Sequence, residues 1–271
     1  MVLPLLALLF AGLAAAETSS RVVLSPPLAQ WKRDIEAAGK TTVVLARVFT
    51  DTARNELTLP DDVEFRPFLR KMLNDEAFVK QFVQTHAINV NSNTGLRPIS
   101  VVLLNMARSA DWEGQEDAVI AHELGHIWLH TRGYEAPQGL DGLSCVAVHA
   151  GDIVQHVLIR EQMRARHIDY LPFWISSLEA ALLQMDGRTV SNPQIADQCQ
   201  HISRLALWVD VAVGLSDREW PRRQALLAGF RNRFPELKDR SDRIAAILRG
   251  RNLNQKVMYQ KTLRSVLLNI H

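Results

Sequence analysis

The pattern of apolar and polar positions divides the chain into a mixed first part and a helical second part. In the first part, short apolar runs rich in β-branched residues predict strands at 41–49, 87–90 and 99–107. Turn-forming residues at 91–98 separate the last two runs. Between Pro60 and Gln84, apolar residues recur at helical spacing and predict one or two helices that cover the first strand.

Strand patterns stop after Gly133, and apolar periodicity then predicts helices at 143–165, 171–185, 194–215, 217–232, 236–249 and 253–269. The sequence therefore predicts an α+β fold with a small sheet within 17–135 and a mainly helical part over 136–271. Before the first strand, Pro26 and Pro27 lie in a polar stretch that predicts an extended lead-in to the domain.

Residues 1–16 contain no charged side chain and end in Ala14, Ala15 and Ala16. An apolar stretch followed by small residues is typical of a secretory signal peptide, so we expect cleavage after Ala16 and a secreted or periplasmic protein. The alternatives are an uncleaved anchor and a buried first helix. No later apolar stretch reaches about 18 residues, so we expect no stable membrane span after cleavage.

Export would place the two cysteines of the chain in an oxidising compartment. Cys145 and Cys199 lie in different predicted helices, and we expect either a disulfide between them or two buried thiols. The formal net charge of +2 comes from 31 basic and 29 acidic residues, with no long run of like charge. This balance gives no indication of a nucleic-acid partner.

The chemistry of the sequence centres on the stretch VIAHELGHIW at 119–128. On a helix, residues four apart lie on one face, so His122 and His126 can direct two imidazoles at one metal ion. Glu123 lies about a third of a turn away, where a carboxylate can reach a water bound to that metal. The rest of the stretch is uncharged, and buried ionisable groups need a partner such as a metal ion.

This stretch resembles the active-site helix of the zincin metallopeptidases. The resemblance implies a zinc site with His122 and His126 as ligands, Glu123 as general base, a peptide or protein substrate, and a sheet with an antiparallel edge strand beside the helix. The metzincin continuation is excluded, because Leu129 and Arg132 stand where that subclass has glycine and histidine.

A catalytic zinc needs a third protein ligand, and the next predicted helix offers candidates. His130 lies about 6 Å further along the helix than His126 and is therefore expected to lie outside the metal shell. Four residues of the next helix share one stripe, at offsets of 0, 4, 7 and 11, namely Cys145, His149, Asp152 and His156. Alternatively, these four residues form a solvent-exposed face of the helix.

The segment HELGHIWLH also resembles the ImmA/IrrE-type peptidases, whose third ligand is a carboxylate some 25 residues after the second histidine. Asp152 follows His126 by 26 residues and is the first candidate. His149 and His156 are alternative ligands or groups that stabilise the transition state. Asp141, in a segment that resembles the loop of the aspartate zincins, is the reserve.

These observations predict an exported zinc-dependent metallopeptidase that hydrolyses peptide bonds through a metal-activated water. The alternatives are a non-catalytic exported protein that binds zinc or a partner, and a peptidase dedicated to one protein substrate. Glu123 distinguishes the first alternative, because a structural zinc site has no use for a general base.

Overall fold

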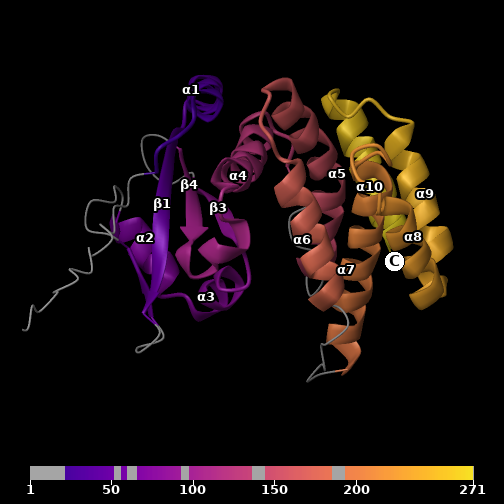
Figure 1. Cartoon of the computed structure of the whole chain (residues 1–271). Coiled ribbons are helices and arrows are strands. Elements are labelled where there is room, and N and C mark those ends of the chain that lie inside the picture. Colours follow the sequence, from indigo (N-terminus) through magenta and orange to yellow (C-terminus); the bar gives the residue numbers. More distant parts are fainter. Residues whose placement is uncertain are drawn as a thin grey trace, which may run out of the picture.

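The computed structural model describes residues 22–51, 56–59, 66–92, 98–135, 144–184 and 193–270. The predicted signal peptide and the reserve ligand Asp141 lie outside these residues. The described part confirms the α+β fold, with one small sheet followed by a helical second half (Figure 1).

The sheet has the strand order β2-β1-β4-β3. Strand β1 (Thr42–Asp51) runs parallel to β4 (Ile99–Asn105), while β2 (Glu56–Thr58) and β3 (Ala87–Ser92) are antiparallel edge strands. The inner strand β4 is buried almost throughout, as its mainly apolar sequence predicts. The three-residue strand β2 has no apolar run of its own and was not predicted.

Alternate residues of β4 face two different layers. Val101 and Leu103 pack with the helices α2 (Arg66–Leu73) and α3 (Glu76–Phe82). Val102 and Leu104 belong to the larger core with α1 (Pro26–Gly39) and α4 (Glu116–Thr131). This alternation follows from the two-residue period of a strand.

The prediction of an extended lead-in at Pro26 and Pro27 is wrong, because both residues open helix α1. Proline fits the first turn of a helix, where the backbone N–H has no intrahelical partner. From there α1 buries Leu28, Trp31 and Ile35 in the larger core.

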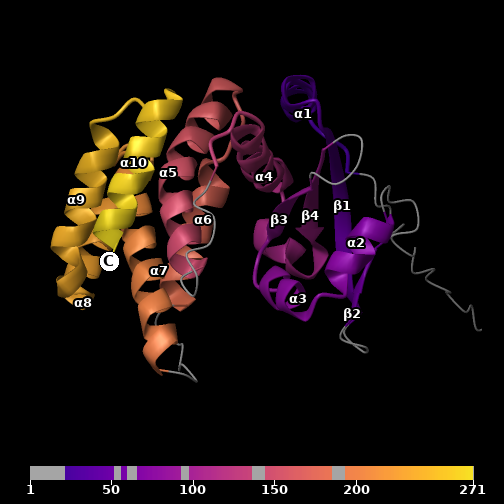
Figure 2. The ribbon, with the colours of Figure 1, turned by 180° about the vertical axis from the view of Figure 1, so that it is seen from behind.

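The helical second half contains α5 (Ser144–Ala165), α6 (Leu171–Gln184), α7 (Pro193–Gly214), α8 (Arg223–Arg233), α9 (Lys238–Arg249) and α10 (Lys256–Ile270). Two short 3₁₀ helices, η1 (Met106–Trp112) and η2 (Pro235–Leu237), lie in the connections. Helix α5 contacts α4 on one side and α7 and α10 on the other, so it joins the two halves (Figures 1 and 2). One apolar core extends from Leu28 to Ile270, so the change in architecture near residue 135 is no break in packing.

Most predicted helix boundaries lie within three residues of the observed ones. The exception is the helix predicted from residue 217, which begins at Arg223. Glu219 accepts hydrogen bonds from the backbone and hydroxyl of Ser216, and this turn occupies the start of the predicted segment. Within the described residues, no helix is long and apolar enough to cross a membrane.

Cys199 lies in α7 and takes part in a disulfide bond. The other cysteine of the sequence, Cys145, belongs to helix α5, and its side chain lies outside the described part of the structure.

Candidate metal centre

The two histidines of the HELGH segment lie on α4, between the edge strand β3 and helix α5. Gly125, between them, allows α5 to approach closely. A Cβ atom at this position would lie 2.7 Å from Cγ2 of Ile159. The close approach brings the preceding turn of α5, which carries His156, to the two histidines of α4.

The imidazole nitrogens of His122, His126 and His156 converge on one point. Nε2 of His122 lies 3.1 Å from Nε2 of His126 and 3.2 Å from Nε2 of His156. One ligand atom from each of the three residues lies within 4.8 Å of the others. In a tetrahedral site with Zn–N bonds of about 2.0–2.1 Å, neighbouring nitrogens are about 3.3–3.4 Å apart. The spacing of the histidines therefore fits zinc.

The outer nitrogen of His126 is held by a neutral side chain. Its Nδ1 lies 2.8 Å from Oε1 of Gln155. The Gln155 amide is itself oriented, because its Nε2 donates to the carbonyl of Tyr134 and to the hydroxyl of Tyr259. Since Oε1 accepts only, Nδ1 of His126 must carry a proton, and in the neutral ring Nε2 then has a free lone pair.

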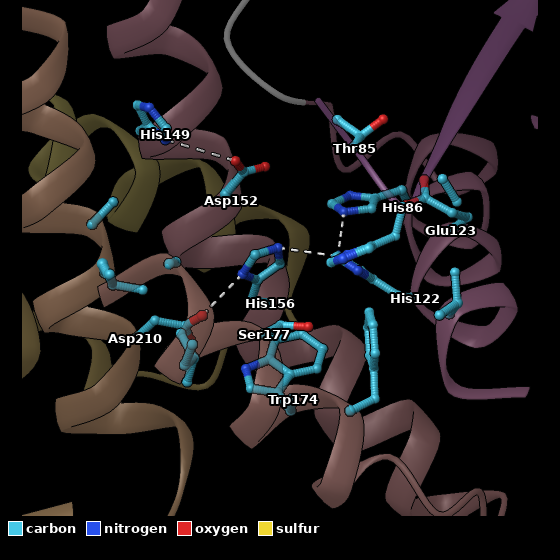
Figure 3. Close-up of a pocket in the computed structure, with 18 of the residues that line it drawn as sticks. Thr85, His86, His122, Glu123, His149, Asp152, His156, Trp174, Ser177 and Asp210 are labelled. Carbon is cyan, nitrogen blue, oxygen red and sulfur yellow. Dashed lines mark hydrogen bonds and ion pairs between the residues drawn. The ribbon is translucent and has the colours of Figure 1, made fainter. Parts of the chain in front are cut away.

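The outer nitrogen of His156 is held by a carboxylate. Its Nδ1 lies 3.2 Å from Oδ2 of Asp210 (Figure 3). Oδ1 of Asp210 accepts a hydrogen bond from Arg160. Burial alone would raise the pKa of Asp210, but the Arg160 charge and the hydrogen bond from His156 outweigh it and hold this pKa well below its usual range. An ionised Asp210 requires a proton on Nδ1 of His156, and in the neutral ring the lone pair then lies on Nε2.

Two lone pairs therefore point at Nε2 of His122, which can donate a proton to only one of them. Burial, followed by repulsion from His126 and His156, lowers the pKa of His122 well below its usual value, so this ring is neutral at physiological pH. Neutral imidazoles with facing lone pairs are the state that a metal ion requires. The donor set fits a divalent ion such as Zn²⁺ without any change of tautomer at His126 or His156.

Glu123 lies in the wall of the same cavity. It is only 7% exposed, and its Oε2 accepts a hydrogen bond of 2.7 Å from Nδ2 of Asn89 on the edge strand β3. Burial raises the pKa of Glu123 despite the opposing effects of His126 and the Asn89 hydrogen bond. A buried carboxylate that is held in place and whose pKa is raised meets the requirements of a general base.

The cavity beside the three histidines has a volume of about 440 Å³. Trp174 forms part of its wall, with its ring 5.2 Å from that of His122 and 5.1 Å from that of His156 (Figure 3). The apolar part of the lining comes mainly from α6 and α7, and includes Phe173, Leu178, Ala181, Ala206 and Leu207.

Of the predicted third ligands, the structure brings His156 to the metal centre and leaves Asp152 and His149 outside it. Asp152 lies one helical turn before His156, about 6 Å along α5, so its carboxylate misses the point where the three nitrogens meet. Asp152 and His149 line the cavity instead and lie 4.0 Å apart, between Oδ2 and Nδ1 (Figure 3). The group of side chains that could hold a metal ion therefore includes His156 and not the first-ranked candidate, Asp152.

The sequence did not identify the residues that support the centre, namely Asn89, Gln155, Arg160, Trp174 and Asp210. Asp210 had a recognisable signal, because it is the single charged residue in the apolar run at 205–214. A buried charge in such a run needs a partner. The other four residues had no comparable signal.

Comparison of the chain with protein-family models, with curated proteins and with solved structures finds no match. The function must therefore be inferred from the site itself.

Proposed function

We propose that this protein is an exported zinc-dependent metallopeptidase. The observation that carries the proposal is the convergence of three imidazole nitrogens, with lone pairs fixed by Gln155 and Asp210, in a cavity that also contains the buried carboxylate of Glu123. The antiparallel edge strand β3 beside the HELGH helix supports the zincin resemblance. Export rests on the predicted signal peptide at 1–16.

His122, His126 and His156 would hold the metal ion, and Glu123 would act on water. When bound, zinc lowers the pKa of a water ligand and polarises a carbonyl oxygen. Glu123 accepts the proton of the attacking water and passes it to the leaving amine of the peptide. Asn89 holds one carboxylate oxygen of Glu123, which fixes the orientation of the base. Burial raises the pKa of Glu123, and a higher pKa makes a carboxylate a stronger proton acceptor.

A non-catalytic zinc protein is the competing function, and Glu123 and the cavity oppose it. A structural zinc site has four protein ligands and no open position. Within the described residues, only His122, His126 and His156 form a group that can hold a metal ion, and a cavity adjoins them.

The test combines metal analysis with peptide hydrolysis by the purified protein. We expect about one zinc per chain in the wild type and in Glu123→Gln, and loss of about 10²–10⁴-fold in hydrolysis rate in the variant. His156→Ala should lose the metal, whereas Asp152→Ala should keep it. Hydrolysis is measured on a peptide mixture by mass spectrometry. Absence of metal from the wild type, or equal hydrolysis by Glu123→Gln, would refute the proposal.

A further inference from the structure

The charge of the chain is distributed unevenly. Residues 217–271 contain 13 Lys and Arg and 5 Asp and Glu, a net charge of +8, whereas residues 1–216 carry −6. No acidic residue follows Asp242. After Asp242, every charged side chain of α9 and α10 is therefore basic.

Helix α10 exposes apolar and basic side chains on one face. Val257, Lys261, Arg264 and Leu268 follow at offsets of 0, 4, 7 and 11, which define one helical stripe. Val257 is 64% exposed and Leu268 83% exposed, and Lys261 and Arg264 between them are also exposed. We call these four residues the α10 outer face. The opposite face of the helix carries Tyr259, Leu263, Val266 and Ile270, which are buried in the core.

The packing of the protein does not account for the α10 outer face. Within the described part of the chain, neither Lys261 nor Arg264 forms an ion pair with a carboxylate. An exposed leucine is ordinary by itself. Two apolar side chains that flank two cations on a single stripe fit a partner whose surface is negative and whose interior is apolar.

We propose that the α10 outer face docks on an anionic lipid membrane. Lys261 and Arg264 would contact lipid phosphates, and Val257 and Leu268 would enter the region between the headgroups. Helix α10 has 15 residues and would lie in the plane of the membrane surface. The combination favours lipid over nucleic acid, because a nucleic-acid backbone offers phosphates but no apolar layer beneath them.

Docking through this face is compatible with access to the cavity. Helix α10 contributes no residue to the cavity lining, which comes from α4 to α7 and the segment around His86. The helix lies on the side of the bundle remote from the sheet (Figure 2). A membrane-bound molecule would therefore keep its candidate metal centre open to substrates.

The experiment measures partition of the complete chain to phosphatidylglycerol/phosphatidylcholine vesicles and to pure phosphatidylcholine vesicles. All proteins carry the same N-terminal segment, so the difference between the two vesicle types reports binding to negative lipid. We expect Lys261→Gln/Arg264→Gln to reduce that difference roughly thirtyfold, from about 1 kcal/mol for each basic residue at such a surface. The matched control Lys71→Gln/Lys80→Gln removes the same charge from exposed positions on α2 and α3 and should have little effect.

A second pair of measurements separates lipid from other polyanions. Val257→Ser/Leu268→Ser should weaken vesicle binding without changing its salt dependence, and should leave binding to duplex DNA unchanged. Equal vesicle binding by the α10 charge variant and its control would overturn the proposal. Tight DNA binding that depends on Lys261 and Arg264, without preference for anionic vesicles, would assign the face to nucleic acid instead. Neither result affects the zinc and hydrolysis measurements, so failure here is distinct from failure of the proposed function.

Discussion

Replacement of Asp210 by Asn tests whether the tautomer of His156 controls metal binding. Asp210 accepts two hydrogen bonds, one from Nδ1 of His156 and one from Arg160. Asparagine has one acceptor and one donor group. Arg160 only donates and is 3% exposed, so the Asn oxygen must remain with it, and the Asn amide then faces Nδ1 of His156.

Two donors that face each other force His156 to accept at Nδ1 and to carry its proton on Nε2. This change removes one of the three lone pairs from the metal centre. Loss of an outer hydrogen-bond partner of a metal-binding histidine costs about 10–100-fold in metal affinity, which corresponds to about 1.4–2.7 kcal/mol. The buried Arg160 also loses its counter-charge, so the metal-free protein should be destabilised by about 1–3 kcal/mol.

The assay is a competition titration with a zinc chelator, combined with urea unfolding of the metal-free protein. Asp152→Asn is the matched control, because it removes a carboxylate from the same cavity without a contact to any of the three histidines. We expect zinc affinity to fall in Asp210→Asn and to stay near the wild-type value in Asp152→Asn. Equal affinities in the two variants would refute the link between Asp210 and the metal centre.

Two further predictions concern helix packing and pH. Gly125→Ala places a methyl group against Ile159, so it should cost about 1–3 kcal/mol in unfolding free energy and weaken zinc binding, whereas Gly229→Ala, with open space around its Cβ, should be neutral or stabilising. The metal-free protein should lose stability as the pH falls below 6.5, because the folded state lowers the pKa of His122 and only the unfolded chain takes up that proton readily. Urea unfolding across this range should show a smaller loss in His122→Gln. Equal unfolding free energies of the two glycine variants, or equal pH dependence with and without His122, would contradict these expectations.

The layers of the fold were predictable where burial alone dictates the sequence. Strand β4 is mainly apolar because it is covered on both faces. Helix α4 carries a single carboxylate, Glu123, after its first turn because it lies between β3 and α5. Helix α1 was missed because two prolines were taken to exclude a helix, although the first turn tolerates them. Local pattern therefore predicted the elements that burial imposes and missed α1, whose first turn carries two prolines.

The candidate site also contains residues that the sequence predicts and residues that it does not. Spacing within one helix predicts His122, Glu123 and His126. The third ligand depends on how far α5 is displaced along its axis relative to α4, and one turn of displacement exchanges Asp152 for His156. The two helices approach closely at Gly125 and Ile159, and no periodicity in the sequence encodes that contact. Asp210 is more remote still, since it lies 54 residues beyond His156.

The exchange of Asp152 for His156 also changes the electrostatics of the site. A carboxylate ligand would offset one charge of a divalent ion, whereas three neutral imidazoles offset none. Asp210 supplies little compensation, because Arg160 already neutralises it. The remaining buried carboxylate beside the histidines is Glu123, whose pKa is raised by burial in the absence of a cation. A divalent ion in this site would favour the ionised form of Glu123. Metal binding and activation of the general base are therefore expected to be coupled. Glu123, which accepts the proton, would be ionised when the three histidines bind a metal ion.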